Sequence, residues 1–174
     1  LSTQKVTGFA PKIDNYYVRS IVEATDGSAV AIGGALESVG GSDKPRHGIA
    51  VFETDGTLRK NNVSSVVRGA GAEASVMSVK ADEQGLYAAS YSRLGTFEGV
   101  MRLNWTTGNI DYMADCHGDS YDVLPAGDVV YAVDHRDPRT GSCTIARGIV
   151  GSKGGEPTIA APLYKEVYSL VTGR

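Results

Sequence analysis

The chain repeats a pattern of short apolar runs separated by glycine-containing turns. In the first copy, runs at residues 18–22, 29–34 and 48–52 follow one another along the chain. Turns are expected at Asp26-Gly27 and Asp55-Gly56. Each run has the length of a strand and is bounded by turn residues, which predicts a small antiparallel meander.

Weaker copies of this meander follow the first. The second has apolar runs at 76–79, 86–91 and 99–105, the third has runs at 120–123, 128–133 and 143–148, and a fourth begins at 167. Repeats of about 40–50 residues with several strands each are typical of propellers. We therefore predict an all-β fold, a β-propeller-like array of antiparallel meander units over about 9–58, 59–112, 113–155 and a partial unit at 156–174. Segment 61–74 is interpreted as an insertion.

Three units and part of a fourth are fewer than most closed propellers contain, because these use about four to eight. We therefore expect an incomplete propeller, and a chain that is a piece of something longer. Seventeen basic and twenty acidic residues give a net charge of −3, with no basic excess for binding nucleic acid. No apolar run approaches the roughly 18 residues of a membrane span. These patterns predict neither a nucleic-acid partner nor a membrane span.

The order of motifs in the first unit resembles a known repeat of bacterial secreted proteins, the delta-60 repeat. The matching positions are Phe9, Pro11, Asp26-Gly27, Gly33-Gly34, Val39-Gly40-Gly41 and Asp55-Gly56. Residues 116–123 are similar to a unit start in extracellular propellers of actinobacteria and in minor tail proteins of their phages. The resemblance implies an extracellular or cell-surface protein, or alternatively a virion tail protein.

The two cysteines, Cys116 and Cys143, lack the CxxC spacing of zinc sites. Cys116 precedes the first strand of the third unit and Cys143 opens its third strand, so one middle strand separates them. Strands lie about 5 Å apart, which makes a disulfide geometrically feasible. An extracellular context favours the disulfide, and two free buried thiols are the alternative.

A polar cluster in the third unit is the candidate binding site. Asp119 precedes the first strand, while Asp134 and His135 end the second, so these residues and His117 are expected at one edge. The alternative is a hydrogen-bonded corner without function. We predict no metal site and no cofactor, because no further residues have metal-ligand spacing.

Ser120 in Gly118-Asp119-Ser120 does not fit a catalytic serine, because strand residues follow it where a nucleophile elbow needs a helix. We therefore predict no catalytic residue. The favoured function is a non-enzymatic extracellular module that binds a cell-surface glycan or protein, within a longer chain or assembly. The alternatives are a phage-tail protein for structure or host attachment, and an enzyme fragment with an active site in a propeller funnel. Acidic residues or metal ligands that recur at the same position of each unit and point to one place would favour the enzyme. Knowledge of the parent assembly would distinguish the binding module from the phage-tail protein.

Overall fold

The computed structural model describes residues 8–14, 17–40, 47–67, 74–93, 96–115, 119–127, 129–134, 149–152 and 157–159. These residues form thirteen β-strands and one 3₁₀ helix, η1 (Val63–Ser65). The strands are β1 (Ile13–Asp14), β2 (Val18–Glu23), β3 (Ala29–Gly34), β4 (Ser38–Val39), β5 (Ile49–Glu53), β6 (Ala74–Asp82), β7 (Gly85–Ser92), β8 (Gly99–Leu103), β9 (Ile110–Asp115), β10 (Ser120–Ala126), β11 (Val129–Asp134), β12 (Ile149–Ser152) and β13 (Pro157–Ile159). The predicted all-β class is confirmed.

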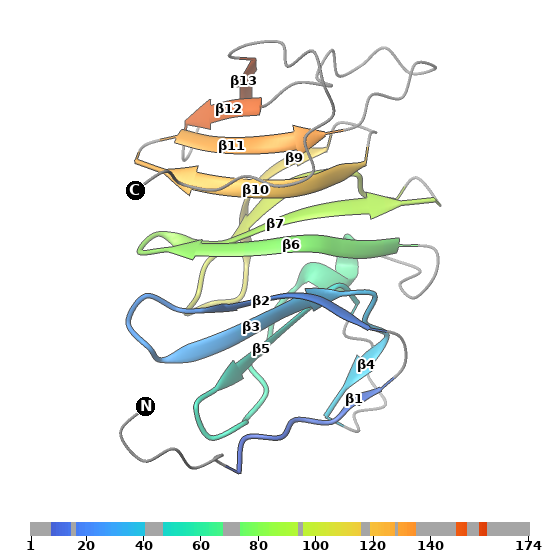
Figure 1. The fold of residues 1–174 in the computed structure, drawn as a ribbon, viewed down its shortest axis with the longest axis vertical. Coiled ribbons are helices and arrows are strands. Elements are labelled where there is room, and N and C mark those ends of the chain that lie inside the picture. Colours follow the sequence, from blue (N-terminus) through green and yellow to red (C-terminus); the bar gives the residue numbers. More distant parts are fainter. Residues whose placement is uncertain are drawn as a thin grey trace.

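The three larger sheets take their strands from successive parts of the chain, except that β4, between β3 and β5 in the sequence, pairs with β1. The strand orders are β2-β3-β5, β6-β7-β8-β9 and β10-β11-β12-β13, and every neighbouring pair is antiparallel. A small pair, β1-β4, lies beside the first sheet. Figure 1 shows the larger sheets stacked in chain order, with β2, β6 and β10 at successive levels. The described residues form no closed ring of sheets.

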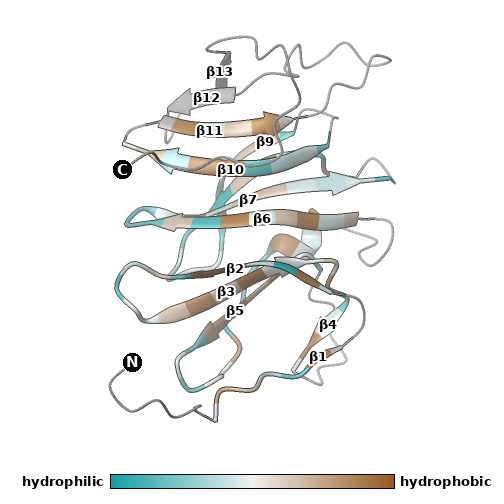
Figure 2. Cartoon of the chain, viewed as in Figure 1, coloured by the Kyte–Doolittle hydropathy of each residue, from teal (hydrophilic) through white to brown (hydrophobic). Residues whose placement is uncertain are grey.

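The apolar core lies between the stacked sheets. Between the first and second sheets, Ala31, Ile49 and Val51 pack in one cluster with Val76, Val79 and Met101. Between the second and third sheets, Val123, Val130 and Ala132 pack with Tyr87, Ala89 and Val100. Figure 2 shows hydrophobic segments along the strands that face these layers. Both faces of the second sheet are therefore covered, which explains why almost every residue of β7 is buried.

The outer side of the first sheet has a third apolar cluster, which β1, β4 and the preceding segment help to cover. Ile32, Ala50 and Phe52 of the sheet pack with Leu36 and Val39 in this cluster. The ring of Phe9 contacts the ring of Phe52 edge to face, with centroids 5.9 Å apart. The Phe-x-Pro start of the first unit thus closes the end of the stack.

A bulge recurs in the first strand of each larger sheet. The pairing register shifts between Val18 and Ser20 in β2, between Val76 and Ser78 in β6, and between Ser120 and Asp122 in β10. A bulge inserts one unpaired residue and redirects the side chains that follow it. The three sheets therefore share a structural device that the glycine pattern did not indicate.

The turns predicted at Asp26-Gly27 and Asp55-Gly56 are present, and local interactions favour both of them. Gly27 and Gly56 have φ angles of 71° and 90°, a region that glycine occupies without steric cost. Asp26 and Asp55 each accept a hydrogen bond from the backbone N–H two residues later, at 2.9 and 2.8 Å. These side-chain hydrogen bonds are typical of Asx turns.

Two strand assignments differ from the sequence expectation. β9 was not predicted and adds a fourth strand to the second sheet, because its alternating residues bury one side against β8 and expose the other. The third strand of the last sheet was expected at 143–148, whereas β11 pairs with Ile149–Ser152. Residues 143–148 lie outside the described residues. In segment 61–74, expected as an insertion, the described part holds η1.

Candidate functional site

The predicted polar site lies at the start of β10 and the end of β11. Ser120 and Asp134 are partners in the ladder, so Asp119, which directly precedes Ser120, lies at the end of the sheet where β10 begins and β11 ends. Asp119 is half-buried there. His117, His135, Cys116 and Cys143 lie outside the described residues. The binding role of Asp119, Asp134, His117 and His135 and the Cys116–Cys143 disulfide stay predictions.

The chemistry available at this edge is limited within the described residues. Ser120 is completely buried, so its hydroxyl is not open to a substrate. No group of three or more His, Cys, Asp or Glu side chains among the described residues is arranged to hold a metal ion.

A buried polar cluster joins the second and third sheets, and sequence reasoning missed it. The hydroxyl of Ser78 in β6 donates to Oδ1 of Asp122 in β10 at 2.5 Å. The same oxygen accepts the backbone N–H of Val123 at 3.0 Å. Lys80 Nζ lies 3.7 Å from it. Asp122 is 3% exposed and Ser78 is 6% exposed, so the contact is shielded from solvent.

Burial makes this cluster important for the junction between the two sheets. A carboxylate removed from water is tolerated only when hydrogen bonds and opposite charge replace its hydration. Asp122 has both kinds of interaction. It accepts hydrogen bonds from a hydroxyl and a backbone amide, and it lies near a partly exposed ammonium group. The cluster therefore favours one position of β10 relative to β6.

The first and second sheets are joined at the equivalent position. Ser20, the residue after the bulge in β2, donates to the Val79 carbonyl at 3.4 Å and accepts the Val79 N–H at 3.1 Å. Ser20, Ser78 and Asp122 all follow the bulge of their strand. In the sequence, these three residues occupy the same position within their units. That shared position could have indicated the cluster, but it is recognisable only after the bulges have been located.

A second polar feature is an open cleft between turns of the first and second sheets. Its lining residues are Asp26, Ser28, Glu53, Arg59, Lys60, Trp105, Thr106 and Thr107. Arg59 donates from Nε and Nη2 to the two carboxylate oxygens of Glu53 at 2.6 and 2.8 Å, and from Nη1 to the Trp105 carbonyl at 3.2 Å. The hydrogen bond from Arg59 lowers the pKa of Glu53. The guanidinium group is thus already engaged within the protein.

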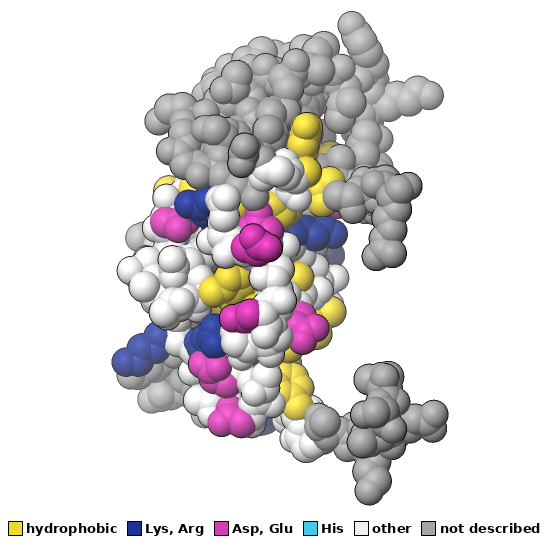
Figure 3. Space-filling view, turned by 90° about the vertical axis from the view of Figure 1, so that its left-hand side faces the viewer, with side chains coloured by type: hydrophobic (Ala, Val, Ile, Leu, Met, Phe, Trp, Pro, Cys, Tyr) yellow, Lys and Arg dark blue, Asp and Glu magenta, His cyan; other side chains and the backbone are white. Residues whose placement is uncertain are grey.

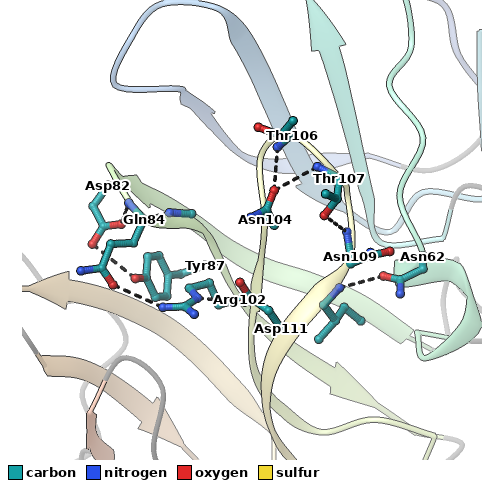
Figure 4. A network of polar contacts seen from close by, with 12 residues as sticks. Asn62, Asp82, Gln84, Tyr87, Arg102, Asn104, Thr106, Thr107, Asn109 and Asp111 are labelled. Atoms are coloured by element: carbon teal, nitrogen blue, oxygen red, sulfur yellow. Dashed lines mark hydrogen bonds and ion pairs between the residues drawn. The ribbon is translucent and has the colours of Figure 1, made fainter.

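The hairpin of β8 and β9 beside this cleft is fixed by its own polar contacts (Figure 4). Asn104 Oδ1 accepts the backbone N–H groups of Thr106 and Thr107 at 2.9 and 3.0 Å. Asn62 Oδ1 accepts the Ile110 N–H at 3.0 Å, which ties the segment around η1 to β9. These hydrogen bonds stabilise the turn and its attachment to η1, and they indicate no ligand site.

The described surface has no strong charge asymmetry on the face seen in Figure 3, where acidic and basic side chains are interspersed. No helix within the described residues is long and apolar enough to cross a membrane.

Comparison with known proteins connects the C-terminal part of the chain to redox proteins. The family model of the Rieske-like [2Fe-2S] domain matches residues 121–174. The large subunit of nitrite reductase [NAD(P)H] from Klebsiella oxytoca is 44% identical over 48 residues, which is 28% of this chain and 5% of that protein's length. The chain therefore spans a very small part of this relative. No solved structure matches.

These matches overturn the resemblance to the delta-60 repeat and the expectations derived from it. The extracellular glycan- or protein-binding module, the phage-tail protein and the funnel enzyme are not supported. The predicted partner and the extracellular or virion location were wrong for the same reason. The resemblance misled because the glycine motifs that carry it reflect local turns and close sheet packing. Gly27 and Gly56 serve turns, and a Cβ at Gly33 would lie 2.8 Å from Val76 and Val79 of the next sheet. Any closely stacked meander needs such glycines.

The residues in the matched segment do not fit a complete cluster site. A Rieske [2Fe–2S] cluster is held by two cysteines and two histidines. Residues 121–174 contain one of each, Cys143 and His135, while Cys116 and His117 precede the match. The segment that includes β10–β13 is therefore similar to a Rieske-like domain in sequence, but contains half of that donor set.

Proposed function

We propose that this chain belongs to a redox protein in which residues 121–174 serve as a Rieske-like module. The observation that carries the proposal is the coincidence of the family match with one sheet. The match begins at Tyr121, one residue after β10 starts, and includes β11, β12 and β13. The nitrite reductase relative supports the same class of chemistry.

Within such a protein, we propose that this module positions redox partners. Residues 121–174 supply one cysteine and one histidine, so a cluster would also need Cys116 and His117, which precede the match. Asp119, Asp134, His117 and His135 are proposed as part of the contact surface, since Ser120 and Asp134 pair at one edge of the sheet. We further propose that the 174-residue chain is not catalytic by itself. The burial of Ser120 supports this, because the hydroxyl that a hydrolase would need as its nucleophile is removed from solvent.

For the fold, we propose that the larger sheets are successive meander units, at about 9–58, 59–112, 113–155 and a partial 156–174, in an incomplete propeller-like array. The repeated bulges of β2, β6 and β10 support a common unit. The order of stacking along the chain supports an array in which each sheet packs on the next.

The functional proposal is tested by nitrite-dependent NAD(P)H oxidation in the full-length protein that contains this chain. We expect activity in the wild type and a clear loss with Val123→Asp, which places a charge in the apolar layer beneath β10. Val18→Asp is the matched control, because Val18 is 43% exposed on β2. Absence of any NAD(P)H-dependent reduction in the wild type, or equal activity in both variants, would contradict the proposal.

A further inference from the structure

We infer that the β10–β11 hairpin of the Rieske-like segment is held in place by the sheet β6–β9 and does not depend on an iron–sulfur cluster. The inference deepens the proposed function and rests on it only for the name of the segment. It concerns how this chain orders the strands that the family match covers.

The matched segment contains only part of the ligand set of a Rieske cluster. Loops that bind a cluster can order the strands beside them, because metal binding and folding are coupled. Residues 121–174 contain one cysteine and one histidine of the two plus two that a Rieske cluster uses. Cluster ligation would therefore also need Cys116 and His117, which precede β10 in the chain. The contacts of Asp122 with Ser78 and of Val123 with its apolar neighbours use none of these four residues.

Polar contacts join neighbouring sheets at a repeated position. Ser20 in β2 hydrogen-bonds to the backbone of Val79 in β6, and Ser78 in β6 hydrogen-bonds to Asp122 in β10. Each joint lies directly after a bulge in the first strand of a sheet. The start of the Rieske-like segment is thus attached to the preceding sheet by the same device that joins the first two sheets, which lie outside the family match.

Apolar packing also holds the β10–β11 hairpin against the second sheet. Val123, Val130 and Ala132 are 0%, 4% and 1% exposed, and all three pack in a cluster with Tyr87, Ala89 and Val100. Val123 and Ala132 are also partners in the ladder between β10 and β11. Removal of this area from water favours the docked hairpin whatever the state of the cysteines and histidines.

Hydrogen exchange of the 174-residue chain, read at the amides of β10 and β11, tests the inference. We expect strong protection in chelator-treated, iron-free protein under reducing conditions, with no further increase after anaerobic incubation with ferrous iron and sulfide. Cys143→Ser and His135→Ala should leave the protection unchanged. Ser78→Ala should lower it at least several-fold at these strands.

Thr25→Ala is the matched control for loss of a hydroxyl, because Thr25 is exposed at the turn between β2 and β3. The inference is overturned if β10 and β11 become protected only after reconstitution with iron and sulfide, together with a cluster absorption spectrum that Cys143→Ser abolishes. It is also overturned if Ser78→Ala and Thr25→Ala exchange alike. A failure of nitrite-dependent activity would contradict the proposed function and leave this result unaffected.

Discussion

Removal of the Ser78 hydroxyl should destabilise the junction between the second and third sheets. In Ser78→Ala, Asp122 loses its 2.5 Å hydrogen bond and retains the Val123 N–H at 3.0 Å and the Lys80 ammonium group at 3.7 Å. A hydrogen bond to a charged group contributes about 1.5–3 kcal/mol, and a buried acceptor that loses its partner has a desolvation cost of similar size. We therefore expect the free energy of unfolding to fall by about 1.5–3 kcal/mol.

The partner substitution gives a sharper test. Asp122→Ala leaves the Ser78 hydroxyl buried without this acceptor, so a loss of about 1–3 kcal/mol is expected. The double variant leaves neither group unpaired, and it should cost at least about 1 kcal/mol less than the sum of the single changes.

Urea denaturation followed by circular dichroism measures these free energies, and thermal scans should show a shift of about 2–4 °C for each kcal/mol in a chain of this size. Thr25→Ala, at an exposed turn, should stay within about 0.5 kcal/mol of the wild type. Additive single and double variants would refute the direct contact between Ser78 and Asp122.

Three further predictions concern the first sheet. Gly33→Ala should cost about 1–3 kcal/mol, because the new methyl group would lie 2.8 Å from Val76; an unchanged urea midpoint would disprove this close approach. Phe52→Ala should cost about 3–5 kcal/mol in the same assay, since Phe52 is 1% exposed, and a loss below about 1 kcal/mol would show that this cluster carries little stability. The hydrogen bond from Arg59 lowers the pKa of Glu53 below its ordinary value of 4.5. The contribution of the Glu53–Arg59 pair to stability should therefore be fully present above pH 4.5 and should disappear as the pH falls through the lowered pKa. The difference in stability between wild type and Glu53→Gln should therefore shrink in acid, and a difference that grows in acid would reverse the assigned sign.

Much of the local fold was predictable because its causes lie within a few residues. The alternation of apolar runs and glycine turns indicated β3 and β7 closely. The turn at Asp26 was predictable because an aspartate accepts the backbone N–H two residues later, and glycine then takes the positive φ angle. Such interactions need no tertiary partner.

The candidate site was predicted less well. The sequence placed Asp119 and Asp134 at one edge, and the pairing of Ser120 with Asp134 is consistent with that placement. Asp122 lies within a run expected to be a strand, and nothing near it in the chain shows that β10 has a bulge. The family resemblance was wrong because motifs for turns and close sheet packing recur in unrelated proteins.

By itself, the sequence determined the all-β class, the meander order and the turn positions, since backbone preferences and strand periodicity act locally. Only the tertiary structure decided which polar groups meet between sheets. Ser78 and Asp122 are 44 residues apart in the chain, and their contact depends on two bulges and on the stacking of two apolar faces. A buried carboxylate acquires its partners only when those faces have excluded water, so its role follows from packing.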